Sequence, residues 1–248
     1  MIYLTGDTHG EVQRFSADSF PEQKEMTKDD YVIILGDFGL VWDYRGESGY
    51  EKYWLKWLEE KPFTTLFIDG NHENHDRLDA MPVEEWHGGK VHKIRPSIIH
   101  LMRGQVFDID GVKVFAFGGA ASHDIKDGVL EPGDPRIRRW NRDNNKLFRI
   151  NKQSWWDREL PSKVEMAEGM ENLDKAGWIV DFVFTHCTSA STTAMISPTH
   201  SEADVLTRYL QEIKERLQYR YWFFGHHHMN KTIGANEYCL YEQIVRVH

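Results

Sequence analysis

The sequence of 248 residues has little cysteine, few prolines and no long apolar run. Its two cysteines, Cys187 and Cys239, lack Cys-x-x-Cys spacing, which excludes a disulfide-rich scaffold and a zinc ribbon. No apolar run approaches the roughly 20 residues that a membrane-spanning helix needs. The chain also starts in a strand-like run without a basic, apolar leader, so we expect a cytoplasmic protein without a signal peptide.

Positive charge is also scarce. With 30 Lys and Arg against 39 Asp and Glu, the formal net charge is −9, which argues against stable non-specific binding to nucleic acids or membranes. A phosphate-bearing substrate is not excluded, because a bound divalent cation would dominate the local field. The chain has no internal repeat and no interdomain linker, so we predict a single domain over residues 1–248.

Potential metal ligands follow the strand-like runs. The first apolar run ends at Gly6, and Asp7 and His9 come directly after it. The same design recurs four times, with 31–35 followed by Asp37, 63–68 by Asn71 and His72, 179–185 by His186, and 219–224 by His226 and His228.

The recurrence is what indicates a site. An Asp or Asn after a glycine is usually a turn residue, and a lone His at a strand end is more often a hydrogen-bonded core residue. Five such ends in one chain are poorly explained by coincidence. In open α/β sheets, ligands bind outside the carboxyl ends of the strands, so these side chains can converge on one pocket. Carboxylate oxygens and imidazole nitrogens are ligands that divalent transition metals take.

The remaining pattern predicts an α/β protein. Strand-like runs alternate with a helical pattern over residues 50–60, which is typical of a largely parallel sheet. Short runs over 90–117 predict added antiparallel strands, and a long irregular stretch of about 30 residues follows. Residues 11–30 read as a short helix and a loop.

Two capping boxes predict later helices. Ser162 and Glu165 would start a helix that runs to about residue 177, and Ser201 and Asp204 would start another. The Ser- and Thr-rich segment 188–200 between them is a candidate lid.

The ordered motifs resemble those of the calcineurin-like metallophosphoesterase superfamily, and the stretch Gly118 to Pro161, with Trp155-Trp156 and Glu159, resembles a bacterial and phage-type subgroup of it. The most specific parts are Gly70-Asn71-His72-Glu73 and Gly225-His226-His227-His228. The resemblance implies a four-layer αββα fold, in which a two-sheet β-sandwich is flanked by helices. It also implies one phosphoesterase domain with an insertion at about residues 120–160.

The resemblance assigns the site residues. Asp7, His9 and His228 would hold one divalent metal ion, Asn71, His186 and His226 a second, and Asp37 would bridge them. Hard oxygen and imidazole ligands suit manganese, our preferred ion, and also iron, zinc or nickel. His72 would be catalytic, either protonating the leaving group or stabilising its charge.

The implied reaction is hydrolysis of a phosphoester by a metal-bridging hydroxide. The substrate could be a small molecule, a nucleotide or a phosphoprotein, and the enzyme a phosphatase or a phosphodiesterase. The alternatives are a nuclease or cyclic-nucleotide phosphodiesterase, or a catalytically silent, metal-stabilised scaffold. Phe38 follows Gly36-Asp37 where phosphoprotein phosphatases of the superfamily continue toward an Asp and an Arg, which weighs against that class.

Three groups of residues have two readings each. Glu73, His75 and Asp76 either hold Asn71 and His72 or form the solvated start of a helix. The basic cluster from Arg136 to Arg149, which includes Trp140 and Phe148, either contacts substrate or is a solvated surface. Beside the proposed ligands, Cys187 is either a reactive thiol or a small buried residue, and His227 reads as a packing or supporting residue.

Overall fold

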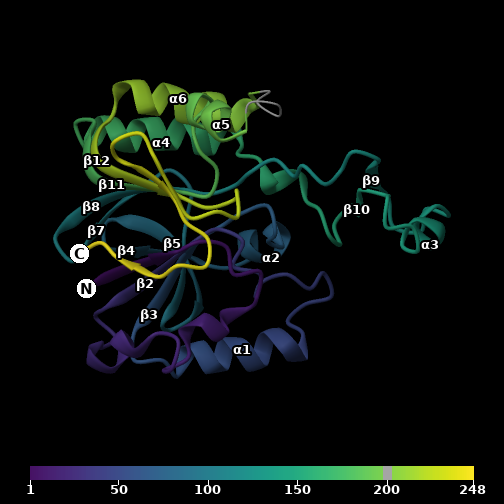
Figure 1. The fold of residues 1–248 in the computed structure, drawn as a ribbon, viewed down its shortest axis with the longest axis horizontal. Helices are drawn as coiled ribbons and strands as arrows, with labels where there is room; N and C mark the ends of the chain where they lie inside the picture. The colour runs from purple at the N-terminus through teal and green to yellow at the C-terminus, as the bar shows by residue number, and fades with distance from the viewer. Residues whose placement is uncertain (198–202) are drawn as a thin grey trace.

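The apolar runs of the sequence form the central strands of two facing sheets, with helices on both outer faces (Figure 1). The structure is a computed structural model, and it describes residues 1–197 and 203–248. The predicted α/β class and the two-sheet arrangement are confirmed. Among the described residues, no helix is long and apolar enough to cross a membrane.

The first sheet has seven strands in the order β15-β1-β2-β3-β6-β5-β4. Its centre is parallel, as predicted, and antiparallel strands complete both edges. The parallel strands are β1 (Ile2–Thr5), β2 (Tyr31–Leu35), β3 (Thr64–Ile68) and β6 (Ile98–Leu101), and the antiparallel ones are β4 (Val83–Trp86), β5 (Gly89–Arg95) and β15 (Val245–Arg246).

The second sheet has six strands in the order β13-β14-β12-β11-β8-β7. Its four inner strands are also parallel to one another. The bounds are β7 (Gln105–Ile109), β8 (Val112–Phe117), β11 (Ile179–Thr185), β12 (Gln218–Phe224), β13 (Lys231–Ile233) and β14 (Glu237–Cys239).

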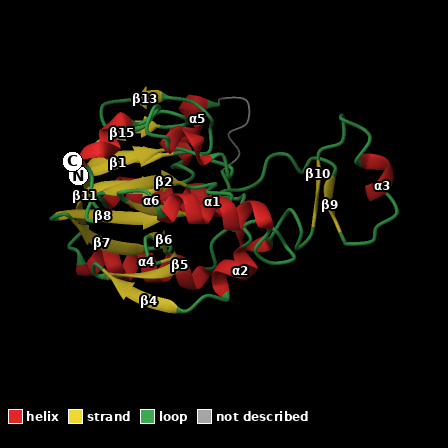
Figure 2. Ribbon diagram, turned by 90° about the horizontal axis from the view of Figure 1, so that it is seen from below, coloured by secondary structure: helices red, strands yellow, loops and turns green. Residues whose placement is uncertain are grey.

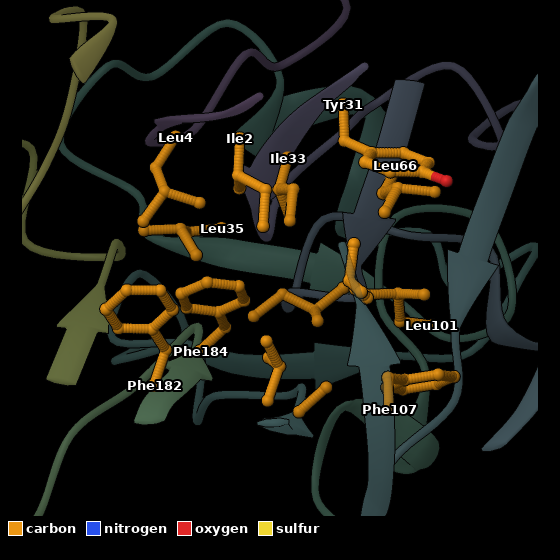
Figure 3. Close-up of a cluster of buried hydrophobic side chains, with 14 of the residues drawn as sticks. Ile2, Leu4, Tyr31, Ile33, Leu35, Leu66, Leu101, Phe107, Phe182 and Phe184 are labelled. Carbon is orange, nitrogen blue, oxygen red and sulfur yellow. The ribbon is translucent and has the colours of Figure 1, made fainter. Parts of the chain in front are cut away.

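The core between the sheets is built by alternate residues of the same strands. Ile33 and Leu35 of β2 point to the second sheet, where they meet Phe182 and Phe184 of β11 (Figure 3). The residues between them on β2 pack in a second cluster under α1 (Gly49–Glu59). Burial on both faces explains why these strands are continuous apolar runs with no polar alternation.

Helices cover the outer faces, as expected for four layers. Leu55 and Leu58 of α1 pack on the first sheet, while α4 (Lys163–Lys175) and α6 (Val205–Arg216) cover the second (Figure 1). The capping box at Ser162 is confirmed, because its hydroxyl accepts from the Glu165 amide at 3.2 Å and Glu165 accepts from the Ser162 amide at 2.7 Å. Since each box satisfies two amide groups that the helix leaves unpaired, it fixes where α4 begins.

The second capping box was placed wrongly. Asp204 caps α6, with its carboxylate accepting from the Thr207 amide at 2.7 Å, so the helix begins at Val205. Ser201 lies outside the described residues. The candidate lid also differs from the expected loop, because α5 (Ala190–Ile196) occupies its described part.

Two other segments are more ordered than the sequence indicated. Residues 11–30 hold two short 3₁₀ helices, Val12–Phe15 and Pro21–Glu25, where one short helix and a loop were expected. The stretch after β8 contains the parallel pair β9 (Gly128–Leu130) and β10 (Phe148–Ile150), with α3 (Ile137–Trp140) between them. In both ribbon views this segment extends away from the two sheets (Figures 1 and 2).

A buried ion pair holds the crossover from one sheet to the other. Arg103 lies in the turn between β6 and β7 and donates to Oδ2 of Asp69 from Nε at 2.8 Å and from Nη2 at 2.5 Å. Nη2 also donates to the carbonyl of Arg158 at 2.8 Å. Burial alone would raise the pKa of Asp69, but Arg103 and His100 hold it well below its ordinary value. The ionised pair therefore fixes the residues just before Gly70-Asn71.

Removing one partner of this pair should be strongly destabilising. We expect Arg103→Met to lower the free energy of unfolding by about 3–5 kcal/mol, because it leaves the buried Asp69 carboxylate uncompensated. The double variant Asp69→Asn, Arg103→Met should lose less, since it removes both charges. Urea unfolding measures both values, and a single variant as stable as the double one would contradict this account.

Candidate metal centre

The predicted ligands follow strands that end at one edge of the molecule. β1, β2 and β3 run parallel in the first sheet, and β11 and β12 run parallel in the second. Because parallel strands place their carboxyl ends at the same edge, the turns after them can face one another. The contacts described below join residues that are up to 219 positions apart in the chain.

Four of the predicted residues form one tight group. The ligand atoms of Asp7, His9, Asp37 and His228 all lie within 4.8 Å of one another. Nε2 of His228 lies 3.0 Å from Oδ2 of Asp7 and 3.0 Å from Nε2 of His9. The two carboxylates are buried, while the two imidazoles are partly exposed.

A second group lies on the other side of Asp37. Nδ1 of His186 donates to the carbonyl of Leu35 at 2.8 Å, which leaves the lone pair of Nε2 free. Nε2 lies 3.4 Å from Oδ1 of Asp37 and 3.3 Å from Oδ1 of Asn71. The ring of His226 packs edge-on against His186, with centroids 5.0 Å apart.

Asp37 contacts both groups. Its Oδ1 lies near His186, and its Oδ2 lies 3.7 Å from Nε2 of His9. All seven predicted ligand residues are therefore brought to one region, with the Asp37 carboxylate between the two sets of donors.

His72 stands beside this region. Its amide donates to Oδ1 of Asp37 at 2.8 Å, and its ring meets His9 edge-on at 4.9 Å between centroids. Trp42 stacks on the His72 ring at 5.5 Å with an interplanar angle of 28°. Burial lowers the pKa of His72 to about 4, against the opposing charge of Asp37, so the imidazole is neutral at neutral pH.

Backbone strain is concentrated at these turns. His9, Asp37, His226 and His228 have φ between 44° and 65°, a region that residues with side chains seldom adopt. Each such residue costs of order 1–3 kcal/mol and persists where the surroundings impose it. The strained turns aim side chains from the strand ends inward, which ordinary extended backbone would not do.

Two glycines allow the turns to approach one another. A Cβ on Gly70 would lie 2.0 Å from Oδ1 of Asp37, and one on Gly225 would lie 2.3 Å from Oδ1 of Asp7. The sequence marked both glycines as strand ends, but their close approach to carboxylates on other strands is visible only in the fold.

The donor set fits a divalent transition metal. Oδ2 of Asp7 is buried and accepts no hydrogen bond of normal geometry from the described residues, although His228 lies 3.0 Å away. Burial would raise the pKa of Asp7, but His186, His228 and the His226 amide lower it, so the carboxylate stays ionised. Buried anionic oxygens and imidazole nitrogens that share one small space are suited to a cation.

Glu73 holds the loops that carry the proposed ligands. Its buried carboxylate accepts from the Gly39 amide at 3.0 Å and from the Gly70 amide at 2.6 Å, which ties the turn after β2 to the turn after β3. His75 begins α2 (His75–Asp79) and is buried 4.0 Å from Asp69. Of the two earlier readings, the structure favours support of the site for Glu73, whereas Asp76 pairs with Lys152 at the surface.

Two further residues support the site, namely Ser122, which no sequence pattern marked, and Glu159, which was part of the subgroup resemblance but had no assigned role. Nδ2 of Asn71 donates to the Ser122 hydroxyl at 3.3 Å, and that hydroxyl donates to Glu159 at 2.5 Å. Glu159 also accepts from the Ser122 amide at 3.0 Å. The two residues lie 37 positions apart in a stretch without periodicity, so only the tertiary structure pairs them.

The packing readings for the neighbouring residues agree with the structure. The His227 ring packs edge-on against Phe224 at 6.0 Å between centroids. Cys187 is buried, and burial raises the pKa of its thiol to about 12, so it is not a thiolate at neutral pH.

The family described as calcineurin-like phosphoesterase matches residues 1–230. The chain belongs to this family. Membership indicates a metal-dependent phosphoester hydrolase, and the Asp and His cluster supplies a candidate metal site for it.

Several curated relatives within the family share one description. The chain is 29% identical over 144 residues to lariat debranching enzyme A of Xenopus laevis and 28% identical over 144 residues to the lariat debranching enzyme of Danio rerio. The match to the enzyme of Schizosaccharomyces pombe is 30% over 119 residues. These alignments cover 52%, 52% and 43% of this chain, but only 26%, 24% and 24% of the relatives, so the chain spans about a quarter of their length.

A solved structure assigned as a 5′-nucleotidase from Staphylococcus aureus, in complex with alpha-ketoglutarate, is also similar. It has 12% sequence identity and a TM-score of 0.42, and the alignment covers 97% of this chain and 48% of that chain.

The close approach at Gly225 generates a prediction. We expect Gly225→Ala to lower the free energy of unfolding by about 1–3 kcal/mol and to weaken manganese binding, because the new Cβ displaces Asp7 or the Leu35 carbonyl. Gly49→Ala is the control, since a Cβ there meets nothing within 4 Å. Urea unfolding and calorimetry with Mn²⁺ measure both effects, and equal behaviour of the two variants would refute the packing argument.

Proposed function

We propose that the chain hydrolyses phosphoester bonds with a pair of divalent metal ions, with manganese preferred and iron, zinc or nickel as alternatives. The position of Asp37 between the two donor groups carries this proposal. Asp7, His9 and His228 would hold one ion, and Asn71, His186 and His226 the other, with Asp37 shared. A shared carboxylate is what two neighbouring cations require to lie close together.

When bound, such a pair lowers the pKa of a coordinated water and neutralises phosphoryl oxygens. The protein's own contribution is to hold the ligands in place and to supply His72. Because Trp42 stacks on its ring and its amide is bound to Asp37, the His72 side chain is oriented toward the same region. Its imidazole would either protonate the leaving oxygen or stabilise its charge through an N–H hydrogen bond.

The substrate class stays open between phosphomonoesters and phosphodiesters. The similarity to lariat debranching enzymes is a reason to test a nucleic-acid substrate beside small molecules. The silent-scaffold alternative is disfavoured, since a scaffold has no need of His72 beside the metal ligands.

We further propose that residues 1–248 are one domain with an insertion at about 120–160. A cytoplasmic location stays a prediction.

Removal of metal should abolish turnover. We expect the manganese-loaded protein to cleave p-nitrophenyl phosphate or its bis-ester, to lose this activity after dialysis with EDTA and to regain it with Mn²⁺. Asp37→Asn should lose both metal and activity, whereas Glu212→Gln on the exposed surface of α6 should lose neither. A protein that retained no manganese, or an Asp37→Asn variant with normal metal content, would contradict the proposed site.

Replacement of His72 should affect turnover without affecting metal content. We expect His72→Asn to lower kcat by about 10²–10⁴-fold, the range for loss of a positioned acid or hydrogen-bond donor. Metal content by elemental analysis should match that of the unaltered protein, because His72 is not a proposed ligand. Unchanged kcat would show that His72 has no catalytic role.

A further inference from the structure

Residues 121–150, which follow β8 and contain β9, α3 and β10, are called the 121–150 segment. The start of this segment lies against the candidate metal centre. Ser122 accepts from Asn71 at 3.3 Å, and the His123 ring meets the His226 ring edge-on at 5.7 Å between centroids. Two successive residues thus contact two proposed ligands, and Asp124 follows them directly. The base of the segment is therefore part of the wall of the site, although most of the segment extends away from the sheets (Figure 2).

The far end of the same segment returns to this wall. β10 pairs with β9 in parallel, with Arg149 opposite Val129, and this pairing fixes the backbone of Arg149. Nη2 of Arg149 donates to Oδ2 of Asp124. Oδ1 of Asp124 is buried and has no hydrogen-bond partner among the described residues. The pair joins the two ends of the segment beside the site.

The ion pair places Arg149 beside the metal centre. Its partner Asp124 follows directly on Ser122 and His123, which contact the proposed ligands Asn71 and His226.

Two other cationic side chains, Arg14 and Lys152, are already bound to groups of the protein. Arg14 donates to the carbonyls of Asp7 and Tyr241 at 2.9 and 2.8 Å. Lys152 pairs with Asp76 at 2.9 Å. Arg149 has five N–H donors, and within the described residues its recorded side-chain partner is Asp124. Donors therefore remain for another anion.

We propose that Arg149, held by Asp124, binds a phosphoryl group of the substrate at the mouth of the metal centre. The inference rests on the proposed phosphoester hydrolysis and adds a substrate-binding residue to it. A guanidinium presents two parallel N–H groups that match phosphate oxygens. The ion pair with Asp124 restrains the long side chain, so less rotamer entropy is lost when the anion binds.

The competing reading is a purely structural ion pair that closes the segment. That reading predicts lower stability without a change in phosphate affinity. Variants that lack the Arg149 guanidinium separate the two readings when their affinity for inorganic phosphate is measured, because phosphate binding does not depend on turnover.

The experiment uses the full chain loaded with manganese and compares Arg149→Gln, Arg149→Lys and the double variant Asp124→Asn, Arg149→Gln. KM and kcat are measured with p-nitrophenyl phosphate, and the affinity for inorganic phosphate is measured by calorimetry. We expect Arg149→Gln to raise KM and to weaken phosphate binding about ten- to a hundredfold, the usual effect of losing a hydrogen bond to a charged group. We expect kcat to change less than KM, and Arg149→Lys to restore part of the affinity.

Two control variants test whether the loss of any guanidinium in the basic cluster lowers the affinity for phosphate. Arg138→Gln and Arg139→Gln remove exposed guanidinium groups from α3 and should leave phosphate affinity unchanged. If Arg149→Gln alone is unstable, the double variant removes both charges and leaves no unpaired carboxylate. Phosphate affinity that is unaltered in both variants, or lowered equally by Arg138→Gln, overturns the proposal. If the unaltered protein shows no turnover, the proposed hydrolysis is wrong. Calorimetry with inorganic phosphate still tests the role of Arg149 in that case. If the unaltered protein does not bind phosphate, the proposed role of Arg149 is wrong too.

Discussion

Two buried carboxylates surrounded by imidazoles impose the central constraint on this fold. Asp7 and Asp37 are almost completely buried, and the nitrogens of His9, His186 and His228 lie 3.0 to 4.0 Å from them. Burial of charge is costly unless an opposite charge compensates it. Strained φ angles at four of the site residues add to this cost. Occupation by cations would offset both terms, so metal binding and folding stability are coupled in such a site.

Much of this site could be predicted because its ligands follow a rule that acts locally. Each ligand follows an apolar run within a few residues, and a run buried on both faces is recognisable from a short stretch of sequence. Parallel strands then bring residues such as Asp37 and Asn71 to one edge without any further information. The supporting contacts follow no such rule. Arg103 with Asp69, and Glu159 with Ser122, join segments that only the finished fold brings together.

The start of α6 was predicted wrongly and the short elements β9, β10 and α3 were not predicted, for a different physical reason. Serine and aspartate both cap helices well, so the order Ser201-x-x-Asp204 satisfied the pattern although Asp204 is the residue that caps α6. In the 121–150 segment, β9 and β10 have three residues each and α3 has four. These lengths are too short for a periodic pattern to appear above the background of a polar sequence.

The basic cluster illustrates how sequence proximity can group residues that act separately. Arg136 pairs with Asp134 at 2.7 Å and lies over Trp140, while Arg138 and Arg139 are exposed on α3. Arg149 shares their charge but lies on β10, which pairs with β9, and its guanidinium bonds Asp124 beside the residues that contact Asn71 and His226. The solvated-surface reading therefore fits Arg136, Arg138 and Arg139, whereas substrate contact is proposed for Arg149 alone. Net charge gives no guide here, because the field at a phosphate is set by the few groups within about a Debye length of 8–10 Å.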